Sequence, residues 1–120
     1  MTVKNALAGV AVKDLDAAIP WYQRLLDRSP DARPMKEVAE WEFSEGGWMQ
    51  VFQDADRAGS SSVTLVDNDL DVRLADLKAK GITIDSTSSS DDVKTAIISD
   101  PDGNRIVFAE ARNPANRAAS

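Results

Sequence analysis

The chain of 120 residues contains no histidine and no cysteine. Without histidine it has no serine–histidine or cysteine–histidine nucleophilic pair and no imidazole ligand for a metal ion. Without cysteine it has no disulfide framework, no thiol nucleophile and no thiolate metal site. The two absences together argue against zinc chemistry and leave only an all-oxygen site for Mg²⁺, Ca²⁺ or Mn²⁺.

Long apolar runs and a basic leader are also missing. No stretch approaches the ~20 apolar residues of a membrane span, and residues 1–10 lack the basic and apolar regions of a secretory signal. The chain has 14 Lys and Arg against 20 Asp and Glu, a net charge of −6. This charge disfavours nucleic acid and anionic membranes and attracts cations, although simple solubility also accounts for it. We therefore expect a cytoplasmic protein with neither nucleic acid nor a membrane as partner.

Two similar Asp-Leu-Asp segments, Asp14–Asp16 and Asp69–Asp71, each follow an apolar strand. Aspartate is a favourable N-cap, and the apolar residues that follow recur at helical spacing. The pattern predicts amphipathic helices over 15–26 and 70–80, with Tyr22 on the buried stripe of the first. The chain therefore reads as two copies of one strand–helix–strands unit.

Alternating and β-branched residues, bounded by turn residues, predict the strands. Residues 100–104 (Asp-Pro-Asp-Gly-Asn) are typical of a tight turn. We expect loops over 28–34 and 87–92. The predicted strands are 5–12, 38–44, 48–53, 62–67, 82–86, 93–99 and 105–110.

Gly46 and Gly47 suggest a two-residue hairpin loop. Such a loop would pair Trp41 with Phe52 and would place five side chains on one face, away from Glu40 and Glu42. That face would form the wall of a stacking pocket, with one amide to orient a ligand, or else part of the core. The five residues are Trp41, Phe43, Trp48, Gln50 and Phe52.

The Asp-Leu-Asp-Ala-Ala segment at 14–18, Trp21-Tyr22 in the first helix, the duplication and the turn at 100–104 together resemble the vicinal oxygen chelate superfamily. That superfamily includes glyoxalase I, bleomycin-resistance proteins and extradiol dioxygenases. The resemblance implies an α+β fold of two tandem βαβββ modules that form a cupped mixed sheet with helices on the convex side. It also implies a ligand on the concave side, often completed in a homodimer. The parts would be one module over 3–54, a connector over 54–61, a second module over 62–110 and a tail over 111–120. The two modules would pair either within one chain or by swapping between the chains of a dimer.

Metal-dependent members of this superfamily use histidines on a first strand and at the start of the second module, and a glutamate on the last strand. By spacing, these positions fall on Leu7, Ser62 and Val107, none of which is a good metal ligand. The departure from the family pattern therefore predicts no metal and no other cofactor. It also places the chain nearer the metal-free, bleomycin-resistance-like branch, whose role is antibiotic resistance.

The sequence thus predicts a metal-independent protein that binds and sequesters an aromatic or cationic small molecule. Arg105 shares the strand parity of Val107 and either reaches the ligand or is simply exposed. One alternative is a lyase or isomerase that uses a carboxylate as general base, with Glu40, Glu42 and Glu110 as candidates. Another is a glyoxalase-like metalloenzyme, for which Glu110 would be a displaced ligand.

Overall fold

The structure, a computed structural model, describes residues 2–111. The chain forms two compact units: unit 1 contains residues 2–63 and the turn Asp100–Asn104, and unit 2 contains Thr64–Ser99 and residues 105–111. No helix within the described residues is long and apolar enough to cross a membrane. Of the predicted tail, residues 112–120 lie outside the described part of the chain.

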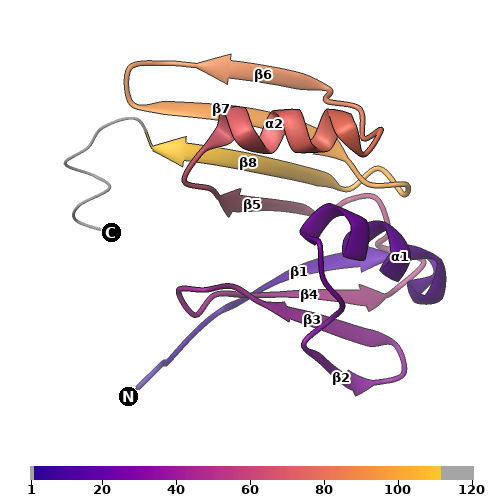
Figure 1. The fold of residues 1–120 in the computed structure, drawn as a ribbon. Coiled ribbons are helices and arrows are strands. Elements are labelled where there is room, and N and C mark those ends of the chain that lie inside the picture. Colours follow the sequence, from indigo (N-terminus) through magenta and orange to yellow (C-terminus); the bar gives the residue numbers. More distant parts are fainter. Residues whose placement is uncertain (1, 112–120) are drawn as a thin grey trace. The chain divides into compact units, whose positions relative to one another are not determined.

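Unit 1 is a four-stranded sheet with one helix against one of its faces (Figure 1). The strand order is β1-β4-β3-β2. β1 runs parallel to β4, and the other neighbouring strands are antiparallel. The elements are β1 (Leu7–Val12), α1 (Leu15–Leu26), β2 (Ala32–Met35), β3 (Val38–Glu42) and β4 (Trp48–Gln53).

Helix α1 has the predicted bounds, and its first turn is capped as expected. The Asp14 carboxylate accepts hydrogen bonds from the backbone N–H groups of Asp16 and Ala17, which have no partner within the helix. Its buried stripe packs against the apolar face of the sheet, and each large side chain removed from water in this way stabilises the fold by ~1.5–3 kcal/mol. Tyr22 is fully buried there, as predicted. The buried side chains are Leu15, Ala18, Tyr22 and Leu25 on α1, and Val10, Val12, Ala39, Trp41, Met49 and Val51 on the sheet.

The turn Asp100–Asn104 is anchored inside unit 1 by a buried polar cluster. The Asp100 carboxylate accepts the Tyr22 hydroxyl at 2.6 Å, the Asn104 side-chain amide at 2.8 Å and two backbone N–H groups of the turn itself. Asn104 donates to the carbonyl of Ala11 at 2.7 Å and accepts from the N–H of Ser61 at 2.9 Å. Burial, and next the hydrogen bond to Asp100, raise the pKa of Tyr22 well above its usual value.

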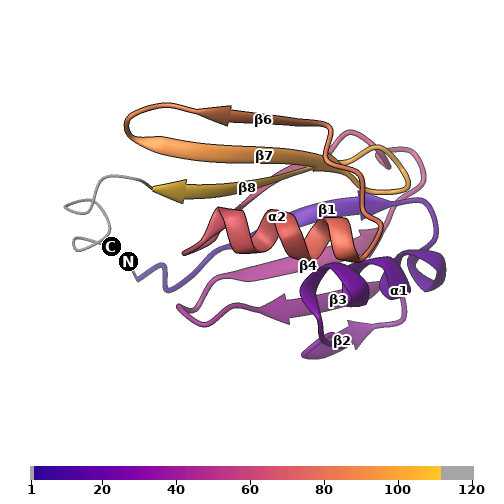
Figure 2. The ribbon, with the colours of Figure 1, turned by 45° about the horizontal axis from the view of Figure 1, so that its top comes forward.

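Unit 2 repeats the plan of unit 1. Its sheet has the order β5-β8-β7-β6, and α2 packs on β7 and β8 (Figure 2). β5 lies beside β8 and points the same way (Figure 1). The elements are β5 (Ser62–Val66), whose first two residues are counted in unit 1, α2 (Leu70–Ala79), β6 (Ser86–Ser89), β7 (Val93–Ser99) and β8 (Arg105–Ala111).

The predicted α+β fold of two βαβββ modules is confirmed, with two local corrections. The predicted loop over 28–34 is wrong at its end, because β2 begins at Ala32. This strand contains Pro34 but lies at the sheet edge, where a missing N–H costs no ladder bond. The predicted strand over 82–86 and the first half of the predicted loop over 87–92 are also wrong, because the strand is Ser86–Ser89. This strand is polar and exposed throughout and is recognisable only by its pairing with β7.

Candidate functional site

The face of the unit 1 sheet opposite α1 carries side chains that the helix does not cover. Across this face Gln50 pairs with both Gly9 and Glu40, and Trp48 pairs with both Leu7 and Glu42. Side chains alternate between the two faces of a strand, so these residues and Phe52 share one face, which we call the open face. Its members are Leu7, Gly9, Ala11, Val38, Glu40, Glu42, Trp48, Gln50 and Phe52, of which Ala11 and Val38 are buried.

The predicted pairing of β3 with β4 is wrong. Glu40, rather than Phe43, lies opposite Gln50, a shift of three positions along β3 (43 minus 40). An odd shift exchanges the faces of a strand. Trp41 therefore faces α1 and is fully buried, while Glu40 and Glu42 lie on the open face. The pairs Glu42–Trp48 and Phe43–Gly47 show that the hairpin loop is longer than two residues.

Trp41 is consequently a core residue. Its ring lies 6.1 Å from that of Tyr22, and its indole N–H donates to the carbonyl of Arg28 at 3.0 Å. A side chain with no exposed surface does not contact a ligand, so Trp41 leaves the predicted set of binding residues. The other predicted residues of the aromatic wall are Phe43, Trp48, Gln50 and Phe52, all half-buried.

A polar pair stands at the centre of the open face. The Gln50 amide donates from Nε2 to Oε2 of Glu40 at 2.8 Å, and both side chains are half-buried. This bond fixes the carboxylate, whose oxygens accept further hydrogen bonds. Trp48 and Phe52 flank Gln50 on the same strand. The open face therefore offers a negative charge and an amide between two aromatic rings, an arrangement suited to a flat compound with a positive or hydrogen-bond-donating group.

Phe52 has two neighbours that sequence reasoning did not connect with it. A Cβ added at Gly9 would lie 3.3 Å from Cε1 of the Phe52 ring, so the ring lies over the glycine. The Arg57 guanidinium carbon lies 5.5 Å from the ring centroid, within the range of a cation–π contact. Gly9 could have been recognised as a point of close approach inside a strand. The position of Arg57 depends on the course of the connector and left no signal in the sequence.

An open depression of about 570 Å³ lies at the end of the unit 1 sheet. The Arg28 guanidinium bonds the Asp31 carboxylate and the carbonyl of Glu42, and Asp31 also accepts the backbone N–H of Glu42. The N–H of Glu42, followed by Arg28, holds the pKa of Asp31 below its usual value. The depression is lined by Arg28, Asp31, Glu42, Phe43, Ser44 and Gly46. Since these charges bond to each other, they chiefly join the α1–β2 loop to the β3–β4 hairpin.

The residues at the expected metal positions do not fit a divalent cation. Leu7 lies on the open face with a hydrocarbon side chain, and Val107 is likewise without a donor atom. Ser62, exposed at the start of β5, offers only a neutral hydroxyl. Within residues 2–111, no group of three or more His, Cys, Asp or Glu side chains is placed to hold a metal ion. We therefore derive no metal-dependent step for this chain.

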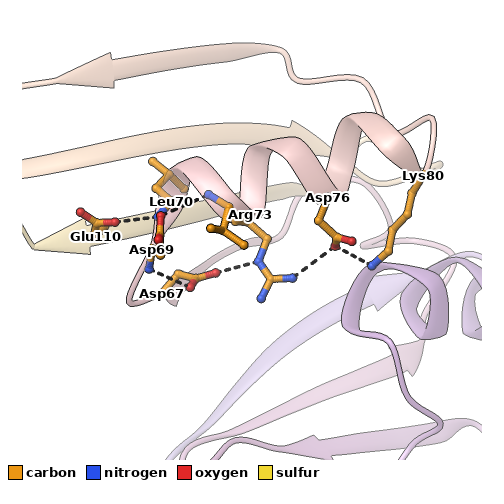
Figure 3. Close-up of polar contacts among 8 residues, drawn as sticks. Asp67, Asp69, Leu70, Arg73, Asp76, Lys80 and Glu110 are labelled. Atoms are coloured by element: carbon orange, nitrogen blue, oxygen red, sulfur yellow. Dashed lines mark hydrogen bonds and ion pairs between the residues drawn. The ribbon is translucent and has the colours of Figure 1, made fainter.

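Glu110 has a structural partner on α2. Its Oε1 accepts the backbone N–H of Leu70 at 2.6 Å (Figure 3). Asp69 caps the same helix end by accepting the N–H of Val72 at 3.2 Å. The two carboxylates satisfy N–H groups that a helix leaves open at its start. Glu110 therefore stabilises α2, and it is a poor candidate for the displaced metal ligand or the general base considered above.

A row of ion pairs runs along α2. Arg73 lies 2.7 Å from the Asp67 carboxylate and 3.7 Å from that of Asp76, which lies 2.7 Å from Lys80 (Figure 3). The Arg73 guanidinium also lies 5.3 Å from the ring centroid of Phe108. This row is therefore a structural ion-pair network of unit 2. Elsewhere in this unit, Arg105 is exposed opposite Ser99 at the start of β8, and its predicted contact with a ligand stays a prediction.

Comparison with known proteins gives a consistent result. The family model described as the Glyoxalase/Bleomycin resistance protein/Dioxygenase superfamily matches residues 5–108. Among solved structures, a glyoxalase/bleomycin resistance protein from Catenulispora acidiphila is 34% identical, with a TM-score of 0.81 over 88% of this chain and 96% of that one. TnmS3, an antibiotic binding protein from a Streptomyces species, is 21% identical, with a TM-score of 0.78 over 92% of this chain and 97% of that one. No curated protein sequence matches at a significant level.

Proposed function

Since this chain belongs to the Glyoxalase/Bleomycin resistance protein/Dioxygenase superfamily, we propose that it binds and sequesters an aromatic or cationic small molecule without a metal ion. One observation carries the proposal: the open face places the Glu40–Gln50 pair between the half-buried rings of Trp48 and Phe52. The similarity to an antibiotic binding protein is consistent with this role.

Each part of the open face has a distinct task in this proposal. The ring of Trp48 stacks on the flat part of the ligand, because aromatic surfaces gain from offset contact beyond their buried area. Gln50 orients the ligand by a hydrogen bond, and Glu40 favours a positive or hydrogen-bond-donating group. Phe43 shares the strand parity of Trp41 and so lies away from the open face. Arg105 remains a proposed contributor to ligand binding, and a second copy of the chain in a homodimer is the proposed partner.

The test is calorimetric titration of chelator-treated protein with a panel of flat aromatic compounds, each in a cationic and a neutral form. We expect binding by part of the panel, unchanged when Mg²⁺ or Zn²⁺ is restored. Trp48→Ala is expected to weaken it at least tenfold, whereas Trp21→Ala on α1 serves as the matched control and leaves it unchanged. Absence of binding by every compound, or equal losses in the two variants, contradicts the proposal. Light scattering of the same samples measures whether the chain is a dimer.

A second function is favoured by the position of Glu40. Of the three carboxylates considered as general bases, Glu40 is the one fixed by a side-chain hydrogen bond on the open face. A base there would remove a proton from a carbon of the bound compound and exchange it with solvent. Proton NMR in deuterated water tests this: a ligand C–H signal should disappear with the wild type and persist with Glu40→Gln. Persistence in both proteins supports binding without chemistry.

A further inference from the structure

Phe52 already has a cation against its ring. Arg57, from the segment that follows β4, places its guanidinium carbon 5.5 Å from the ring centroid. Its side chain is 70% exposed, and the nearest carboxylate oxygen, on Asp54, is 3.9 Å away. Exposed cation–π contacts and exposed ion pairs are among the weakest interactions in proteins. Arg57 therefore contacts the ring only weakly and can leave it at little cost in free energy.

The ring itself is well placed to receive a cation. It lies over Gly9, where any added side chain would press on it at 3.3 Å. Glu40 lies diagonally across from Phe52, because Glu40 pairs with Gln50 and Phe52 is two residues farther along β4 on the same face. Gln50 holds the carboxylate at 2.8 Å. Gly9 and Glu40 lie on β1 and β3, the two strands that flank β4. A flat cation stacked on the ring can reach across β4 to the fixed carboxylate, whereas Arg57 has Asp54 as its neighbouring carboxylate.

We propose that Phe52 and Glu40 form a cation site on the open face, that Arg57 occupies the aromatic part of this site in the free protein, and that a cationic ligand binds by displacing it from the ring. This inference rests on the proposed function, because it assigns the ligand's charge and the residue that competes with it. The exchange replaces one cation at the ring by another, so the ligand gains chiefly from its additional contact with Glu40. A neutral aromatic compound gains nothing from the charge of Glu40 and stacks on Trp48, so in this proposal it does not displace Arg57.

Competition has a measurable consequence. When a fraction of the sites is occupied by Arg57, the apparent affinity for a competing cation falls by that fraction. Removing the guanidinium should therefore tighten cation binding by about threefold, the scale expected of one exposed cation–π contact. Removing the charge of Glu40 should weaken it by about tenfold, as for one lost charged partner.

The test compares N-methylquinolinium with quinoline, which is neutral at pH 8, by calorimetry on the full chain. Arg57→Gln should tighten N-methylquinolinium about threefold and leave quinoline unchanged. Arg24→Gln, an exposed position on α1 with the same charge change, is the control and should alter neither. Glu40→Gln should weaken N-methylquinolinium alone, while Glu37→Gln, exposed between β2 and β3, should not.

A second readout follows Arg57 itself by NMR. Its δ-methylene protons should be shifted upfield by the Phe52 ring in the free protein and should return to ordinary values when N-methylquinolinium binds. Equal effects of Arg57→Gln and Arg24→Gln, or unmoved Arg57 signals on binding, overturn the inference. If both compounds bind equally, the proposed function stands and this inference fails. If neither compound binds to any variant, this inference is contradicted, whereas the proposed function is contradicted only if the whole panel fails to bind.

Discussion

Replacing Tyr22 with phenylalanine removes one oxygen atom from the centre of the buried turn cluster. The lost bond is the 2.6 Å contact from the hydroxyl to the Asp100 carboxylate, whose residue is 5% exposed. Hydrogen bonds to charged groups contribute about 1.5–3 kcal/mol, and Asp100 keeps its bonds to the turn and to Asn104. We expect Tyr22→Phe to lower the free energy of unfolding by about 2 kcal/mol, a large part of a total of about 5–15 kcal/mol. With a urea dependence of about 1–3 kcal/mol/M, the midpoint falls by roughly 1 M.

The same residue gives the stability a defined pH dependence. The pKa of Tyr22 is raised in the folded state, so its stabilisation is complete below the unfolded pKa of about 10 and decreases as the pH rises above it. Above pH ~10 the Tyr22 hydroxyl is ionised in the unfolded chain and still protonated in the folded chain. The free energy of unfolding therefore falls by about 1.4 kcal/mol per pH unit. Tyr22→Phe lacks this loss, so the stability difference between the two proteins should narrow above pH ~10.

The assay is direct because Tyr22 is the only tyrosine in the chain. Tyrosinate absorbance reports its ionisation, and tryptophan fluorescence reports unfolding in the same sample. The two signals should change together in an alkaline titration, since Tyr22 ionises only when the cluster opens. Tyrosinate absorbance that rises near pH ~10 while the fluorescence remains native would refute the reasoning.

Three further predictions concern other contacts. Gly59→Ala should lower the urea midpoint, with a cost of about 1–3 kcal/mol, because φ is +89° there and an added Cβ would lie 2.6 Å from a backbone oxygen, whereas Gly47→Ala meets nothing and should have little effect. Glu110→Ala should lower thermal stability by about 1 kcal/mol through loss of its bond to the first N–H of α2, and Glu110→Gln should retain most of it; equal losses would contradict the capping role. The pKa of Asp31 is lowered by a backbone N–H and by Arg28, so its stabilisation is present above about pH 4 and is lost as the pH falls through the lowered value. The urea midpoint should therefore fall less between neutral and acidic pH in Asp31→Asn than in the wild type.

The sequence was sufficient for features that local chemistry determines. The sequence identifies Asp14 and Asp69 as helix caps because a short carboxylate side chain followed by apolar residues at helical spacing is typical of a helix N-terminus. Tyr22 was placed in the core by the same periodicity, and the structure confirms both helices and this burial. These signals lie within a few residues of each other, so no knowledge of distant contacts was needed.

Which residues face the site depends on the length of the β3–β4 hairpin loop, and the sequence does not determine this length. A Gly-Gly pair favours a two-residue loop, but here only Gly46 has a positive φ, of 95°, and the first strand pair beyond the loop is Glu42–Trp48. The resulting shift of three positions moved Trp41 into the core and brought Glu40 to Gln50. The polar β6 was missed for a related reason: its pairing with β7 selects its strand structure, and its own composition does not.

The two faces of the unit 1 sheet separate the requirements of folding from those of binding. On β4, Met49 and Val51 are fully buried against the helix side, whereas Trp48, Gln50 and Phe52 alternate with them and remain partly exposed. Changing a buried side chain there leaves a cavity and costs several kcal/mol, typically ~2–5. Changing a half-exposed one costs less, because part of its surface already contacts water. Variants on the open face should therefore stay folded, and their binding can be interpreted as a property of the site itself.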